Sequence, residues 1–191
     1  MGDYVSLAYF KAWKHVSLST DDVVLEGMIT AAENYFNKKT GTVFRIRKPT
    51  WRRFDAVRDV YQDELHLDYN LVKDTQIING DGSTVAVADR QLLTPNSPPY
   101  WGIRLLSGSW TYHTHSADAI RVRGYWGYSL KAPPDVVEAI CELTAYYYAG
   151  KDSQQFETAS FHEGGILVVP KGVPANVIDK IYNYRRAGVA K

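Results

Sequence analysis

The segment "GYWGYSLKAPPDV", residues 124–136, joins three kinds of sequence and decides how the chain is divided. Tyr125, Trp126 and Tyr128 stand beside glycines, a double proline follows, and an apolar helical pattern then begins. Aromatics beside glycines fit a sugar platform, a base-stacking surface or the end of a packed strand. Proline suits a first helical turn, because its missing N–H would have no partner there. The segment predicts a strand end, a corner and a helix start.

Two amphipathic helices are expected upstream of this segment. Residues 6–14 form a short one, with Ser6 as its N-cap. In the second, Ser19 and Asp22 resemble a capping box, and Gly41 suits the C-cap. Its core-facing positions recur at helical spacing: Leu25, Met28, Ile29, Ala32 and Phe36.

From residue 50 to residue 126 the helical pattern gives way to alternation. Apolar and polar residues alternate in 65–70 and again in 120–126, as on half-buried strands. "INGDGST" has the composition of a tight turn, and Val85 and Val87 alternate after it. This stretch of the chain predicts a compact antiparallel β unit.

Helical pattern returns after the double proline. Pro134 opens a helix that extends to about Gly150, residues 151–172 form a long loop without a clear period, and Pro174 opens a last helix. The expected fold class is α+β, a small α-helical bundle with an inserted antiparallel β unit. One domain, 1–191, would comprise a first helical segment (residues 1–49), the β insertion (residues 50–126) and a second helical segment (residues 133–191).

The composition is ordinary for a globular protein and excludes several classes. Hydrophobic residues make up 45% of the chain and charged residues 23%. No run approaches the roughly 20 apolar residues that span a bilayer, and no signal peptide is recognisable, so no membrane contact is expected. Cys141 is the single cysteine, which excludes an internal disulfide and fits a reducing compartment.

Charge is balanced overall but uneven along the chain. A formal net charge of +1 argues against a dedicated nucleic-acid binder. Residues 38–58, however, carry eight Lys and Arg against the single acid Asp55. A solvated strand face and a contact with phosphate or an acidic protein both explain this segment. The candidate contacts are Arg45, Arg47, Lys48, Arg52 and Arg53.

No catalytic residue, metal site or cofactor is expected. His113 and His115 would share one face of a strand, but no third ligand is nearby, so exposed strand histidines are favoured over a metal pair. Cys141 lies in an apolar helical surface, where a thiol packs as a small hydrophobe. Neither a Walker A pattern nor a nucleophile elbow is present.

Aromatic residues are abundant, with 14 Tyr, 5 Trp and 6 Phe. Such residues bind sugars, stack on bases or fill protein interfaces. Three successive tyrosines, 146–148, cover nearly every side of a helix. A helix wedged within its own subunit and a subunit interface both remain open.

The order of motifs resembles the head-to-tail connector (adaptor) proteins of tailed bacteriophages. The matching stretches are "YVSLAYFKAW", "STDDVVLEGMITAAENYFNKKTGTVF", "QLLTPNSPPYWGIRLL", "IRVRGYWGYSLKAPPDVVEAICELTAYYY" and "VPANVIDKIYNYRR". They span most of the chain in the right order. The large β insertion is a departure, since many short connectors lack it.

The resemblance implies a non-enzymatic virion protein, assembled in the host cytoplasm and located in the virion neck. It implies a ring, typically of twelve copies, below the portal and above a tail-completion, stopper or tail-terminator protein. Double-stranded DNA would pass through the lumen. "GYWGYS" would then pack onto the helical body. Because the family's C-terminal segment commonly engages the portal, the implied portal contacts are Pro174, Ile178, Ile181, Tyr182, Arg185 and Arg186.

The stretch "ILVV" within 151–172 is expected to be an extended strand that pairs with a neighbouring subunit. Four apolar residues, three of them β-branched, are unsuited to a solvated loop. A lone strand needs a partner, and residues 151–163 would be mobile in the free protein. The expected intersubunit contacts are Ile166, Leu167, Val168, Val169 and Tyr146.

Two other classes of function fit portions of the sequence. The aromatics fit a carbohydrate-binding module of a phage baseplate or fibre. The basic segment 38–58 fits a nucleic-acid-binding protein.

Overall fold

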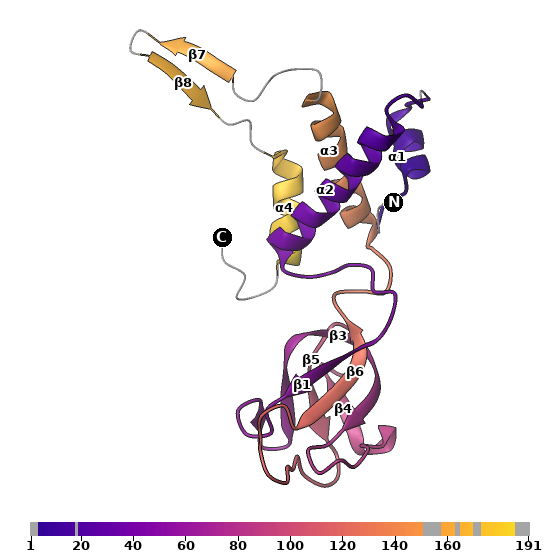
Figure 1. The fold of residues 1–191 in the computed structure, drawn as a ribbon, viewed down its shortest axis with the longest axis vertical. Coiled ribbons are helices and arrows are strands. Elements are labelled where there is room, and N and C mark those ends of the chain that lie inside the picture. The colour runs from indigo at the N-terminus through magenta and orange to yellow at the C-terminus, as the bar shows by residue number, and fades with distance from the viewer. Residues whose placement is uncertain (1–3, 18, 151–157, 163–164, 170–172, 186–191) are drawn as a thin grey trace. The chain divides into compact units, whose positions relative to one another are not determined.

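The computed structural model describes residues 4–17, 19–150, 158–162, 165–169 and 173–185 (Figure 1). The chain divides into two compact units, and each has its own core. The helical unit comprises residues 1–41 and 132–191, and the β unit comprises Thr42–Lys131. Helices in one unit and an antiparallel sheet in the other confirm the predicted α+β class.

In its described residues the helical unit contains four helices, α1 Leu7–Lys14, α2 Asp22–Thr40, α3 Pro134–Gly150 and α4 Ala175–Tyr184. Helix α2 packs against α3 and α4, and α3 packs against α4. The predicted stripe of α2 is buried except at Met28, which is half-buried. The facing side chains of α3 and α4 are buried as well: Val136, Ala139, Ile140, Cys141, Leu143, Val177 and Ile181.

Most of the predicted helix ends are right, and the predicted capping box is wrong. The Ser6 hydroxyl accepts from the Tyr9 N–H at 3.2 Å, Gly41 ends α2 in the left-handed conformation, and α3 begins at Pro134. The capping box at Ser19 does not form. Asp21 is the N-cap of α2 without a side-chain cap bond, and its carboxylate accepts from the Tyr148 hydroxyl at 2.7 Å.

The β unit is one six-stranded antiparallel sheet in the order β1-β6-β3-β5-β4, with β2 paired to β3. Its strands are β1 Thr50–Phe54, β2 Val60–Tyr61, β3 Glu64–Ile78, β4 Arg90–Leu93, β5 Tyr100–Leu105 and β6 Ile120–Trp126. The long β3 pairs with β5 along its first half and with β6 along its second, with register shifts that bend it. The strand expected around Val87 is wrong. Residues Val87–Asp89 form a 3-10 helix instead, with Val87 exposed.

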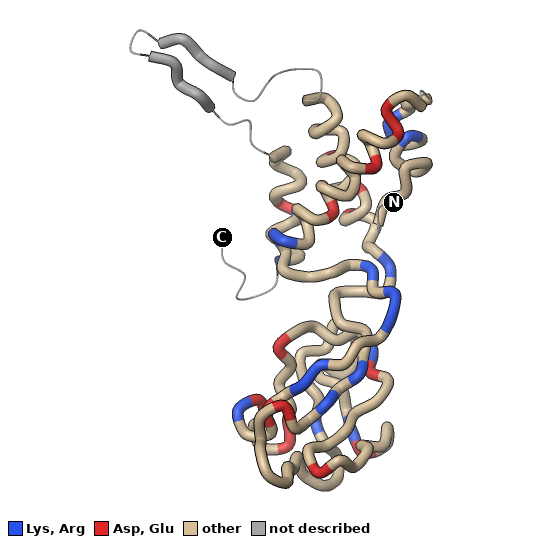
Figure 2. Tube along the Cα trace, in the orientation of Figure 1, with Lys and Arg blue, Asp and Glu red and all other residues tan. Residues whose placement is uncertain are grey.

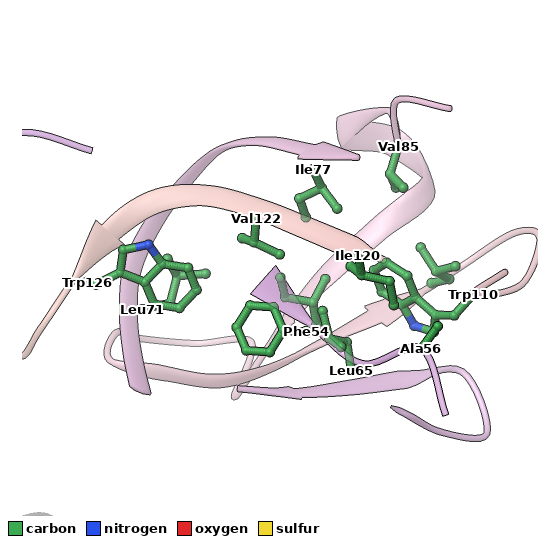
Figure 3. Close-up of a cluster of buried hydrophobic side chains, with 12 residues drawn as sticks. Phe54, Ala56, Leu65, Leu71, Ile77, Val85, Trp110, Ile120, Val122 and Trp126 are labelled. Carbon is green, nitrogen blue, oxygen red and sulfur yellow. The ribbon is translucent and has the colours of Figure 1, made fainter. Parts of the chain in front are cut away.

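The strands of the β unit curve around one cluster of buried side chains (Figure 3). Alternation along β6 places Ile120, Val122 and Trp126 in this cluster, as predicted. The indole N–H of Trp126 donates to the Thr50 carbonyl at 2.9 Å, and that of Trp110 donates to the Asp63 carbonyl at 2.9 Å. Both rings therefore bury their area without leaving a polar atom unpaired.

Two aromatics of "GYWGYS", Trp126 and Tyr128, pack against rings of the β unit, and the prediction that Trp126 packs onto the helical body is wrong. Trp126 lies in the sheet core, 6.0 Å from the Phe54 ring, and Tyr128 lies 5.4 Å from the Phe44 ring. The glycines permit this approach. A Cβ on Gly124 would lie 2.4 Å from a Leu71 methyl, and Gly127 has a φ of +152° beside the Val43 carbonyl.

Residues within the expected long loop 151–172 form a hairpin. Strand β7, Thr158–His162, pairs antiparallel with β8, Gly165–Val169. "ILVV" is extended, as predicted, but it is not a lone strand, because β7 of the same chain pairs with it. The expectation of mobility for 151–157 and 163 falls outside the described residues, and 158–162 belong to β7.

Candidate interaction surfaces

The metal and nucleophile candidates of the sequence can be placed in the described portion of the chain. No group of three His, Cys, Asp or Glu there could hold a metal ion. Residues 113–115 lie in bends and irregular structure, so the predicted strand for this histidine pair is wrong, and the His113 ring lies 2.9 Å from the Asp81 carbonyl. Burial, with Glu138 and Glu142 nearby, raises the pKa of the Cys141 thiol to about 12, so this cysteine is unsuited to act as a nucleophile.

The basic segment 38–58 does not form one surface. Arg52 is held by its own unit: its guanidinium pairs with Asp68 at 2.8 Å and lies over the Tyr69 and Trp126 rings, at 4.6 and 5.3 Å. Arg53, the next residue, points to the other face of β1 and is exposed. The alternation of a strand therefore separates two arginines that the sequence places together.

The other candidates of this segment precede β1. Arg45, Arg47 and Lys48 are exposed, in residues without regular secondary structure. Figure 2 shows Lys and Arg continuing from this stretch along β1 and recurring along β6. The structure thus connects the basic segment to a strand that is distant in the sequence.

Strand pairing gathers basic residues on one outward face of the sheet. Arg53 of β1 lies opposite Arg121 of β6, and Trp51 lies opposite Arg123. Directly opposed side chains project from the same face of a sheet. We call this surface, formed by β1, β6 and the second half of β3, the basic sheet face. Its outward positions are Trp51, Arg53, Lys73, Gln76, Ile78, Arg121, Arg123 and Tyr125.

The sequence predicted the outward direction of some residues of the basic sheet face but not which strands bring them together. Alternation in β6 correctly placed Arg121 and Arg123 away from the core. Their position beside Arg53 depends on the pairing of β1 with β6, which are almost 70 residues apart in the sequence. Lys73 lies on the same face because a register shift between Leu71 and Lys73 breaks the alternation of β3.

Helix α4 has a buried side and an exposed side. Val177 and Ile181 are buried, whereas Ile178 and Tyr182 remain exposed one helical turn apart. The Lys180 ammonium donates to the Glu138 carboxylate at 2.7 Å, and the Tyr184 hydroxyl donates to the Asp135 carboxylate. These two hydrogen bonds hold α4 on α3. Of the six expected portal contacts, Ile181 is thus a core residue, Pro174 is the half-buried N-cap, Arg185 is the half-buried C-cap and Arg186 lies outside the described residues.

The three tyrosines of α3 are all half-buried. The Tyr146 and Tyr147 rings lie 6.1 Å apart, and Tyr148 donates to Asp21 on α2. The pKa of Tyr147 is raised mainly by burial and, to a smaller extent, by the neighbouring Tyr35 and Tyr146. Tyr148 therefore joins α3 to the start of α2, and the intersubunit role expected for Tyr146 stays a prediction.

No described helix is long and apolar enough to cross a membrane. The described residues define an α+β protein whose candidate sites are exposed surfaces on helix α4 and on the sheet.

Comparison with solved structures finds a similar fold in three chains from gene transfer agent particles. A chain from the neck of an empty gene transfer agent (GTA) particle, computed with C6 symmetry, aligns over 100% of this chain and 93% of its own, with a TM-score of 0.60 and 19% identity. A chain of the native GTA virion aligns over 97% of this chain and 91% of its own, with a TM-score of 0.59 and 18% identity. A chain from the native GTA neck, computed with C12 symmetry, covers 100% and 97%, with a TM-score of 0.57 and 17% identity.

These alignments confirm, for the fold, the resemblance to head-to-tail connectors. No protein-family model matches the sequence, and no curated protein matches it. The β unit, which seemed a departure from short connectors, belongs to the shared fold, because the alignments cover nearly the whole of both chains.

Proposed function

We propose that this chain is a structural protein of a phage-like virion neck, in which identical copies form a ring that joins the portal to the tail. The observation that carries the proposal is the full-length match to chains of GTA necks, with both chains covered almost completely. A ring of twelve copies accords with the C12 symmetry of one of those necks. The role is mechanical, without a reaction, and assembly takes place in the host cytoplasm.

In this proposal, the ring docks under the portal, receives a tail-completion, stopper or tail-terminator protein from below and continues the channel for double-stranded DNA. The exposed side of α4 is the portal contact. Ile178 and Tyr182 are apolar or aromatic, exposed and held on a helix whose other side is fixed in the core. Anchored aromatic and aliphatic side chains are common centres of binding energy in protein interfaces.

Portal docking can be tested without unfolding the chain. Deletion after Gly172 is a poor test, because it removes Val177 and Ile181 from the core. The double variant Ile178→Glu/Tyr182→Glu changes only the exposed side of α4. We expect it to lose docking to the portal of its own particle in co-sedimentation, with an unchanged melting temperature.

The matched control is Val23→Glu/Val24→Glu, which places two carboxylates on exposed positions of α2. We expect the control to dock like the wild type. Wild-type docking by the α4 variant would remove α4 from the portal contact. Failure of the wild-type chain to bind the portal, together with tight binding to glycans, would favour a carbohydrate-binding module.

A further inference from the structure

The basic sheet face is a concentrated positive surface without an acid. Its eight outward positions include four cations, Arg53, Lys73, Arg121 and Arg123, and all four are exposed. The β unit as a whole has 12 Lys and Arg against 9 Asp and Glu, and four of its cations lie on this one face. The net charge of +1 for the whole chain does not reveal this positive surface.

The three acids on strand β3 pair with cations outside this face. Asp74 lies opposite Gly124, toward the inner side of β3, and pairs with Arg90. Glu64 pairs with Arg104 at the far end of β3, and Asp68 pairs with Arg52. In the portion of the chain that the structure describes, no ion pair reaches the four cations of the basic sheet face.

The arrangement opposes the stability of the free protein. Arg53 and Arg121 are direct cross-strand neighbours, and like charges in that position repel. Arg123 follows two residues after Arg121 on the same side of β6, about 6.7 Å further along the strand. An anionic partner that covers the face removes this repulsion, and an anion with regularly repeated charges suits it best.

A nucleic-acid backbone has the required chemistry. It carries one phosphate per ~3.4 Å of axis in each strand, so neighbouring phosphates can reach cations on adjacent strands and on alternate residues of one strand. Guanidinium groups bind phosphate oxygens in a bidentate manner. Gln76 lies opposite Arg123 and adds a neutral donor, and Trp51 adds an exposed ring beside it.

An acidic protein fits this face less well. Protein interfaces are enriched in Arg but depleted of Asp and Glu, so a protein partner would rarely present the cluster of carboxylates that four neighbouring cations require. Here the cations occupy the middle strand β6 and both of its neighbours. We propose that the basic sheet face binds the phosphate backbone of nucleic acid. The inference depends on the charges of one unit and does not require the ring.

The test measures binding of the full chain to labelled duplex and single-stranded DNA of mixed sequence, as a function of salt. Wild-type affinity for duplex DNA should fall about 150-fold between about 50 and 200 mM NaCl, since four phosphate contacts give a slope of about −3.6 in log–log form. Arg121→Gln/Arg123→Gln should bind more weakly, with a slope of about −1.8. Its melting temperature should not fall, because the substitutions relieve repulsion.

The matched control is Arg58→Gln/Arg104→Gln, which removes the same charge from the β unit at arginines that pair with Asp59 and Glu64. It should keep the wild-type slope. Preference for duplex or for single strands would support the proposal in either case and identify the form bound. Weakening of single-strand binding by Trp51→Ala would further support stacking on this face.

Three results would overturn the inference. The first is no DNA binding at low salt, the second is an equal loss in the control, and the third is tighter binding to polyglutamate than to DNA. A chain that forms rings on the portal but gives one of these results would refute the inference and leave the proposed function intact.

Discussion

Glu33 is a buried carboxylate on α2 that holds the N-terminal segment in place. Its Oε1 accepts from the backbone N–H groups of Tyr4 at 2.7 Å and of Val5 at 3.0 Å. The Val5 side chain is buried, and this stretch of backbone has no helix or strand to pair with. One carboxylate therefore satisfies two donors that precede α1.

Replacement of Glu33 should destabilise the helical unit. Glu33→Ala leaves the two N–H groups without their acceptor, and we expect the free energy of unfolding to fall by about 2–3 kcal/mol. Glu33→Gln keeps an oxygen at the same position and should recover some of the loss. Denaturant titration measures both. Glu26→Ala on the same helix is the control, and a Glu33→Ala protein as stable as that control would contradict the role.

Single residues also show what a sequence can and cannot reveal about a surface. Alternation predicted that Arg121 and Arg123 point away from the core, and they do. It could not reveal that Arg53 lies opposite Arg121, because register between distant strands depends on tertiary structure. Nor could it reveal that Arg52 is held by Asp68, since that ion pair joins two strands.

Elements with strong local signals were predictable. Helix α2 shows its stripe and its glycine C-cap, and α3 begins at the expected proline. The hairpin β7–β8 was missed because the alternation of its first strand depends on only two apolar residues, Ala159 and Phe161, so only β8 was recognised as extended. Trp126 was assigned to the wrong partner, because burial of an aromatic does not identify the core that receives it.

Helix α3 provides the central contact of the bundle, and Ile140 is its test. The side chain is fully buried, and α3 packs against both α2 and α4. Ile140→Asp would place an unpaired charge in this core and lower the free energy of unfolding by at least about 4 kcal/mol. Val23→Asp, at an exposed position of α2, should have little effect. Circular dichroism measures the melting temperatures of the two variants. Equal melting temperatures for Ile140→Asp and Val23→Asp would contradict the assignment of α3 to the core.

The hairpin β7–β8 is the element that we expect to join neighbouring copies, through residues 166–169. Its two strands form a separate two-stranded sheet, and isolated hairpins are marginally stable in water. Addition of a neighbour's strand would complete its backbone pairing. Hydrogen exchange at 166–169 should therefore slow when the free chain assembles into a ring.

Strand β6 is the internal control for that measurement. It is already paired on both sides, with β1 and β3, so its exchange should be the same before and after assembly. Equal exchange of 166–169 in the free and assembled states would show that β8 makes no contact between copies.

At the scale of the whole molecule, sequence order carried more information than any single motif. Each stretch that resembles a connector is short, yet their order predicted the fold that solved GTA neck chains share at 17–19% identity. The net charge was misleading at this scale. A value of +1 is the sum over two units, and the excess of basic residues belongs to the β unit.

The central claim is that copies of this chain form a ring on the portal. The most direct test is electron microscopy of the purified chain mixed with the portal of its own particle, with the mass of the complex measured on the same sample. The account predicts a closed ring, of twelve copies by analogy with the C12 neck, coaxial with the portal. A chain that stays monomeric in the presence of the portal, or that binds it in scattered single copies, would contradict the account.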